Sequence, residues 1–244
     1  MNERMATATI GEIVATDFRT AAVFDQFGID FCCGGRRLFE EACRAAAADP
    51  TAVTRALDAL PASGDTADNV MGWPLERLIE HIVSIHHAYV RSALPTIARY
   101  LAKLEEVHGA RHPELARIRA YFDQISADLQ QHMVKEEQVL FPYVREIASR
   151  GETRGGARSP FGTIENPIHM MEREHREVAD GLRIIRELSN GYTVPSDGCT
   201  TYAVCMAELL RFERDLHQHV HLENNVLFPR AIELENEMCG VDRG

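Results

Sequence analysis

Apolar residues recur every three or four positions over long stretches of this chain, and this is the periodicity of amphipathic α-helices. Four such stretches cover roughly residues 73–107, 113–149, 162–189 and 197–236. Segments rich in helix-breaking residues separate them, and no Asn-Gly or Asp-Gly turn joins two strand-like segments. The pattern therefore predicts an all-α fold with four long helices and short connections.

Three prolines fall inside these predicted helices, at Pro95, Pro142 and Pro229. Proline lacks the N–H group that the helical ladder needs, and its ring clashes with the preceding turn. We expect Pro95 to kink the first helix, and Pro142 and Pro229 to bend or end the second and fourth.

A smaller helical unit is predicted before the long helices, over residues 1–62. Thr16-Asp17 is expected to cap a helix that stops at Gly28, and Asp49 followed by Pro50 predicts the start of another. Residues 63–72 are expected to form a linker, and residues 73–240 an up-down-up-down four-helix bundle.

One motif occurs twice in the predicted bundle. His132 and Glu136 stand four residues apart and are followed by Leu-Phe-Pro, and His219 and Glu223 repeat the same spacing before a second Leu-Phe-Pro. Side chains at positions i and i+4 of a helix project from one face, one turn apart. Each pair could therefore bind one metal ion, and the duplication predicts a dinuclear site.

Two further histidines extend the pattern, because His87, His132, His175 and His219 recur at nearly constant spacing. At about 100° per residue, each of the four lies within the apolar stripe of its helix. The same calculation predicts that His217 and His221 face solvent. It also places His86 and Glu137 on other sides of their helices than His87 and His132, so they are poorer candidates for metal ligands.

Burying two carboxylates and four imidazoles without partners would cost roughly several kcal/mol of folding free energy for each charged group. A bound metal ion removes that cost. The alternative is a buried polar network without metal. Imidazole and carboxylate without thiolate suit iron, manganese or zinc, with iron favoured. If Glu136 and Glu223 each bridge two ions, a bridging oxygen completes five ligands per ion. One position on each ion then stays open for dioxygen, nitric oxide or peroxide.

Composition narrows the possible partners. The chain has 244 residues, a net charge of −11 and a pI near 5.5, which argues against nucleic acid or an anionic membrane as a partner. We find no signal-like apolar run at the N-terminus and no apolar run of about 18 residues. A cytoplasmic location with cysteines as thiols is therefore expected.

Cys32 and Cys33 precede two glycines, two arginines and a predicted helix start. Amide donors, the helix dipole and positive charge would all favour thiolate, which predicts reactive thiols that bind metal or nitric oxide. The alternative is that both cysteines pack a small domain, and a disulfide between neighbours would be strained. The remaining cysteines are expected to pack as small apolar residues: Cys43, Cys199, Cys205 and Cys239.

With these residues the chain resembles the iron-centre repair proteins, the di-iron RIC family. Asp30-Phe-Cys32-Cys33-Gly-Gly matches the short N-terminal domain of that family. The two His-x3-Glu motifs with Leu-Phe-Pro, and Met-Glu-Arg-Glu-His175, match its hemerythrin-like domain. The resemblance covers nearly the whole chain.

The resemblance implies two non-haem iron ions joined by carboxylates and an oxo or hydroxo bridge. The terminal ligands would be His87, His132, His175 and His219, and the bridging ligands would be Glu136 and Glu223. It further implies a homodimer that repairs iron–sulfur proteins damaged by nitrosative or oxidative stress, by supplying iron. Oxygen-carrying hemerythrins have one more histidine where this chain has Ala179, which disfavours simple oxygen carriage.

Two other functions fit the same ligands. An open di-iron site could be an enzyme, a nitric oxide reductase. It could instead be a sensor of diatomic gas or iron that signals through the N-terminal domain.

Overall fold

The computed structural model describes residues 7–60, 70–150 and 160–239. These residues are helical apart from turns and one isolated β-bridge between Thr9 and Leu38, so the all-α prediction is confirmed. The chain divides into two compact units. The first comprises Met1–Ile79, Val144–Ile164 and His217–Gly244, and the second Glu80–Tyr143 and Glu165–Leu216. Most of the predicted linker, residues 63–69, lies outside the described residues.

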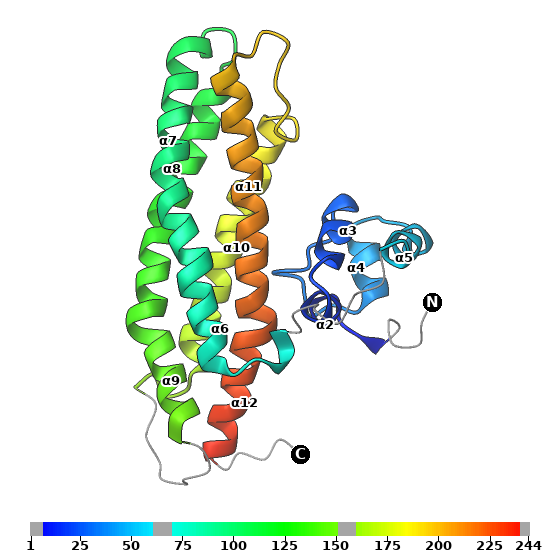
Figure 1. The fold of residues 1–244 in the computed structure, drawn as a ribbon, viewed down its shortest axis with the longest axis vertical. Helices are drawn as coiled ribbons and strands as arrows, with labels where there is room; N and C mark the ends of the chain where they lie inside the picture. The colour runs from blue at the N-terminus through cyan, green and yellow to red at the C-terminus, as the bar shows by residue number, and fades with distance from the viewer. Residues whose placement is uncertain (1–6, 61–69, 151–159, 240–244) are drawn as a thin grey trace. The chain divides into compact units, whose positions relative to one another are not determined.

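The second unit is built from long helices that lie alongside one another (Figure 1). They are α7 (Ala88–His108), α8 (Glu114–Lys135), α10 (Glu165–Leu188) and the first part of α11 (Thr200–Leu222). A short turn joins α7 to α8. Asn190 and Gly191, with φ of 49° and 69°, end α10 in the left-handed region. The four predicted helices are therefore present, while residues 151–159 of the second breaker lie outside the described residues.

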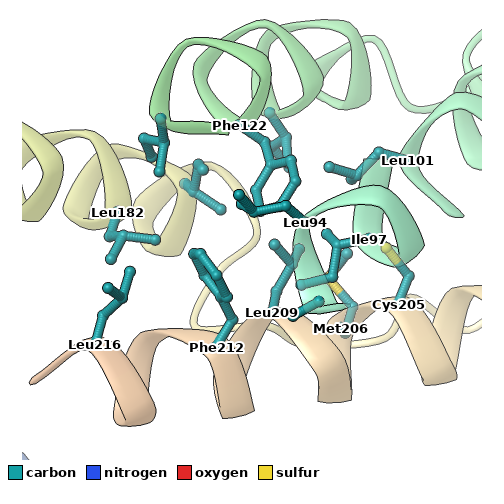
Figure 2. Packing of buried hydrophobic residues seen from close by; sticks show 14 of the residues in the cluster. Leu94, Ile97, Leu101, Phe122, Leu182, Cys205, Met206, Leu209, Phe212 and Leu216 are labelled. Atoms are coloured by element: carbon teal, nitrogen blue, oxygen red, sulfur yellow. The ribbon is translucent and has the colours of Figure 1, made fainter. Parts of the chain in front are cut away.

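The core of this unit consists of apolar side chains that all four helices contribute (Figure 2). Phe122 of α8 and Phe212 of α11 are fully buried and pack edge to face, with ring centroids 5.6 Å apart. Burial of each such side chain contributes about 1.5–3 kcal/mol. This packing holds the helix faces that carry the predicted ligands.

Three of the long helices contain a π-helical segment: η2 (Ile82–His87), η3 (Glu136–Leu140) and η4 (Glu223–Leu227). Helix α6 (Leu75–His81) precedes η2. The backbone amide of Phe141, after η3, donates to the backbone carbonyl of Glu136, and that of Phe228, after η4, donates to the carbonyl of Glu223. Each bond spans five residues, as in a π-helix. All three segments contain a predicted ligand. Such π segments are frequent at functional sites.

The helical runs do not end at Pro142 and Pro229, so that part of the expectation is wrong, and a bend at each proline stays a prediction. Each is the second residue of a further α-helix, α9 (Phe141–Arg150) or α12 (Phe228–Cys239). The π segment before each proline takes the backbone out of the regular ladder, and the first turn of a helix tolerates proline. Val139, within η3, is 45% exposed although uniform α-helical geometry places it inward, whereas the matching Val226 within η4 is fully buried.

The N-terminal residues of the first unit form four short helices. They are α2 (Ile10–Thr16), α3 (Thr20–Gln26), α4 (Phe39–Ala45) and α5 (Pro50–Asp58). Their own apolar cluster includes Phe24, Phe31 and Phe39. As predicted, Asp49 caps α5, and its side chain accepts a hydrogen bond from the Thr51 amide.

The predicted cap at Thr16-Asp17 is confirmed in part, because Asp17 Oδ1 accepts a hydrogen bond from the Arg19 amide at the start of α3, but the helix before it was missed. Residues before it already form α2, and Asp17 is the C-cap of that helix. The signal for α2 is the capping box of Thr9 and Glu12, in which each side chain accepts from the other residue's amide. Helix α3 begins later, at Thr20, and ends before Gly28, whose φ is 66°.

Within the described ranges, no helix is both long enough and apolar enough to cross a membrane.

Candidate metal centre

Glu136 is the first residue of η3 and has no exposed surface. One carboxylate oxygen lies 3.4 Å from His87 Nε2, and the other lies 3.3 Å from His132 Nε2. A carboxylate between two imidazoles, one oxygen facing each, has the arrangement that a bridging ligand requires. Both histidines are also buried, with 0% and 2% of their surface exposed.

The ring of His87 is oriented through its other nitrogen. Its Nδ1 lies 2.6 Å from Glu137 Oε1, and the ring stacks on Phe141 at an interplanar angle of 18°. Burial opposes ionisation of Glu137, but hydrogen bonds from His87 and Arg91 outweigh it and lower the pKa of this carboxyl. Because the carboxylate accepts the Nδ1 proton, the Nε2 lone pair of a neutral His87 faces Glu136.

His132 is oriented in the same way by Glu174. Its Nδ1 lies 2.9 Å from Glu174 Oε2, and Lys135 Nζ lies 2.6 Å from the other oxygen. The hydrogen bond from His132, reinforced by Lys135 and opposed by burial, lowers the pKa of Glu174 to about 2. A neutral His132 therefore also directs its Nε2 lone pair inward.

His175, on α10, completes this group. Its Nε2 lies 3.0 Å from His132 Nε2, and the ring is 2% exposed. Two imidazole nitrogens this close to each other and to a buried carboxylate need a cation or a proton between them. Two imidazoles, from His132 and His175, and the Glu136 carboxylate form a donor set suited to iron, manganese or zinc, so these residues fit a metal ion, and His87 faces the other oxygen of the carboxylate.

The second His-x3-Glu pair belongs to the other unit. His219 Nε2 lies 3.0 Å from Glu223 Oε1, and both side chains are essentially fully buried. Together with the Glu136 group, all six predicted ligands belong to buried sets of histidine and glutamate that could hold metal. His86 belongs to none of these sets, and its Nδ1 instead lies 3.1 Å from Asp215 Oδ1.

Sequence reasoning missed the supporting carboxylates. It rejected Glu137 as a ligand because of its direction, and that direction is what lets it reach the outer nitrogen of His87. Glu174 stands directly before His175 but supports His132, on a different helix. Only the Met-Glu-Arg-Glu-His175 motif could have drawn attention to it.

The prediction that His221 faces solvent was wrong. The ring has no exposed surface, and burial lowers its pKa to about 4. It packs against Phe31, with ring centroids 5.9 Å apart. His217 is partly exposed, and its Nδ1 lies 3.3 Å from Asp25. The calculation failed because it considered only the bundle core, whereas residues of the N-terminal segment cover this face of α11.

Asn225 connects the second motif to the Cys-Cys segment within the same unit. Its side-chain amide donates to the carbonyl oxygens of Phe31 and Cys32 at 3.2 and 3.0 Å. A Cβ added to Gly35 would lie 2.1 Å from Asn225 Oδ1, and one added to Gly11 would lie 2.8 Å from it. A Cβ at either position would therefore force the Asn225 side chain to move.

Cys32 is 4% exposed, Cys33 is partly exposed, and both are free cysteines. The expected thiolate at Cys32 is contradicted. The hydrogen bond with Cys33, burial and the neighbouring Asp30 raise the pKa of the Cys32 thiol well above its ordinary value. The thiol donates to Asp30 Oδ1 at 3.2 Å, and the following helix starts only at Phe39. Asp30, Cys32 and Cys33 nonetheless form a group that could hold a metal ion.

The other cysteines differ from one another. Cys43 and Cys205 are fully buried, as predicted. Cys199 is exposed, so its predicted packing role was wrong. The side chain of Cys239 lies outside the described residues.

Comparison with known proteins is consistent with both halves of this description. Residues 78–231 match the family described as the hemerythrin HHE cation binding domain. Residues 6–61 match a domain of unknown function, DUF542.

Several curated proteins are similar over almost the whole chain. The iron-sulfur cluster repair proteins YtfE of Musicola paradisiaca and Dickeya chrysanthemi are each 34% identical over 224 residues. The protein of the same name from Yersinia pestis is 33% identical. Each match covers 92% of this chain and 96% of the relative.

Proposed function

We propose that this chain, which belongs to the hemerythrin HHE cation-binding family, is a di-iron protein that repairs damaged iron–sulfur clusters by supplying iron. The observation that carries the proposal is the buried Glu136 carboxylate, with His87 Nε2 facing one oxygen and His132 Nε2 facing the other, beside His175. The N-terminal match and the names of the similar proteins support repair as the task. Clusters damaged by nitrosative or oxidative stress would be the substrates.

In this proposal His87, His132 and His175 are terminal ligands of iron, and Glu136 is a bridging ligand. Glu137 and Glu174 hold the histidine rings in place and keep the Nε2 lone pairs directed inward. Bound iron would supply redox chemistry, affinity for dioxygen, nitric oxide or peroxide, and the metal that is delivered.

The pair His219 and Glu223 would contribute the remaining ligands of a second iron. Helix α11 is unbroken from Thr200 to Leu222 and carries Phe212 and Leu216 in the bundle core. His219 follows on the same stripe, two helical turns after Phe212 and one turn after Leu216. This continuity, with the repeated motif, is the argument for two ions joined by Glu136, Glu223 and an oxygen bridge.

Cys32 and Cys33 would receive iron or nitric oxide outside the di-iron centre. The hydrogen bond with Cys33, burial and Asp30 raise the pKa of the Cys32 thiol, so binding of a metal ion there would release a proton. We propose a cytoplasmic location, because a reducing compartment keeps such thiols free. Homodimer formation stays a prediction that sedimentation can test.

The direct test uses a purified dehydratase whose cluster has been destroyed by nitric oxide. Iron-loaded protein should restore its activity faster than an equal amount of free iron with the same reductant. Equal recovery in the two samples would reject the proposal. Sustained nitrous oxide formation over many turnovers would instead indicate a nitric oxide reductase, and reversible gas binding without repair or turnover would indicate a sensor.

Substitution of the glutamates tests the ligand assignment. Glu136→Ala and Glu223→Ala should each lose most of the iron, measured by metal analysis after anaerobic purification, from about two ions per chain in the unmodified protein. Glu106→Gln is the matched control, because that side chain is 69% exposed. Full iron content in either alanine variant would show that the ligands are wrongly assigned.

A further inference from the structure

We propose that Cys199 and His108 form a second reactive site, in which small hydroperoxides oxidise the thiol to a sulfenic acid. The site lies where the end of α7 meets the start of α11, within the unit Glu80–Tyr143 and Glu165–Leu216. It shares no residue with the metal centre. The inference therefore goes beyond the proposed function, and its test has a different readout.

The geometry is that of a nucleophile paired with an imidazole. Cys199 is exposed, and its Sγ lies 3.3 Å from His108 Nε2. His108 itself is only 4% exposed, and its Nδ1 is a buried atom with no hydrogen-bond partner. Tyr202 packs edge-on against the ring, with centroids 5.6 Å apart. A buried imidazole is thus held with one nitrogen directed at an accessible sulfur.

The backbone adds a second stabilising contribution. Cys199 immediately precedes α11, a helix of 23 residues. The backbone amides of Thr201 and Tyr202, in the first turn of α11, also favour a negative charge on the sulfur. Free amides and the positive end of the helix dipole favour a negative charge at this position.

These contacts change the protonation of the thiol. The hydrogen bond with His108, followed by those from the Tyr202 and Thr201 amides, lowers the pKa of Cys199 to about 7. Near neutral pH roughly half of the Cys199 side chains are then thiolate, against a few per cent for an ordinary thiol.

Other charged groups at this end are engaged with each other. His112 lies 3.0 Å from Glu114 and 3.0 Å from Asp197. Arg111 also pairs with Asp197, at 3.0 Å. None of these distances involves the sulfur, so His108 is the ionisable partner of Cys199, and His112 provides a neighbouring histidine for comparison.

The reaction is balanced without a further reactant. The thiolate attacks one oxygen of the hydroperoxide, an S–O bond forms and the O–O bond breaks. Hydroxide or alkoxide leaves and takes a proton from water. Sulfur loses two electrons and the peroxide gains them. Cys205, the next cysteine along α11, is fully buried and cannot approach the product without local opening.

The first test measures the pH dependence of Cys199 alkylation by iodoacetamide in the full chain, followed by peptide mass spectrometry. We expect a midpoint near pH 7 in the folded protein and about 8.5 in the urea-unfolded chain. His108→Gln should move the folded midpoint up by at least about one pH unit, and His112→Gln should leave it unchanged. The unfolded comparison keeps the test valid even if His108→Gln folds poorly.

The second test adds hydrogen peroxide and traps sulfenic acid with dimedone. We expect the dimedone adduct to form at least tenfold faster at Cys199 than at Cys205. A thiol reductant added before the dimedone should prevent the adduct. A folded midpoint equal to the unfolded one, or no adduct at Cys199, would overturn the proposal.

Discussion

At the scale of single residues, the supporting carboxylates decide how the ligand histidines are presented. Glu137 and Glu174 each accept from the outer nitrogen of one histidine, His87 or His132. The two partners of each contact are far apart in the sequence, 50 residues in one case and 42 in the other, and they lie on different helices. The inner nitrogens are thereby set toward Glu136 before any metal binds.

Glu137→Gln and Glu174→Gln should therefore each weaken metal binding by roughly 10–100-fold, because loss of such outer hydrogen bonds frees the ring orientation. Iron affinity can be measured by competition with a chelator. Glu177→Gln is a suitable control, since that side chain is 65% exposed. Unchanged affinity in both variants would show that the rings are held by packing alone.

Gly35 shows how a single missing Cβ permits a contact. Gly35→Ala would place a Cβ 2.1 Å from Asn225 Oδ1, which should destabilise the protein by about 1–3 kcal/mol. Urea unfolding would measure this, with Gly72→Ala as the control because no atom lies within 4 Å of the added Cβ there. Adding Asn225→Ala to Gly35→Ala should recover part of the loss. No recovery would mean that the strain lies elsewhere.

At the scale of elements, the π segments separate what a helical wheel can and cannot predict. The wheel correctly placed His132 and Glu136 on one buried face, because they are one turn apart. It failed at Val139 within η3, which is 45% exposed, but held at the matching Val226 within η4, which is buried. The repeated Leu-Phe-Pro occurs at the ends of η3 and η4. Nothing in its composition specifies the backbone hydrogen bonds between residues i and i+5 that define a π-helix.

The turn between α7 and α8 gives a prediction about pH. Asp197 first, and then Glu114, raise the pKa of His112 above 6.5 through hydrogen bonds. A raised pKa means that the folded state binds the proton more tightly. The stability from this pairing is therefore complete below about pH 6.5 and is lost as the pH rises through the folded pKa.

His112→Gln should remove this dependence, so the stability difference from the unmodified protein should be largest at acidic pH and should shrink above neutrality. Denaturant unfolding at a series of pH values, with histidine NMR titration, would check it. A difference that stays constant with pH would contradict the assigned role of His112.

At the scale of the whole molecule, metal binding and folding should be coupled, because the ligands come from several helices. An ion that binds only the folded state adds about 2.7 kcal/mol of stability at one hundred times its dissociation constant. Thermal unfolding under anaerobic conditions should therefore shift upward as Fe²⁺ is added. Glu223→Gln should show a smaller shift, and an equal shift in both proteins would argue against Glu223 as a ligand.

Much of this architecture could be predicted from the chain itself. The repeat of apolar positions located the long helices. The duplicated motif selected four residues and the histidine spacing selected two more, and all six are buried. Prediction was poorer in the N-terminal segment. There the helices are only seven to nine residues long, so a periodic pattern has little length in which to develop.

The sequence by itself determined the class of fold, the inward faces of the long helices and the type of metal ligand. These follow from local geometry, because 3.6 residues per turn relates neighbours on one helix. Only the tertiary structure decided that His221 is buried, that the Cys32 thiol is buried and that Cys199 contacts His108. The protonation of a side chain depends on burial and on charges brought close by folding, and no periodicity along the chain encodes those distances.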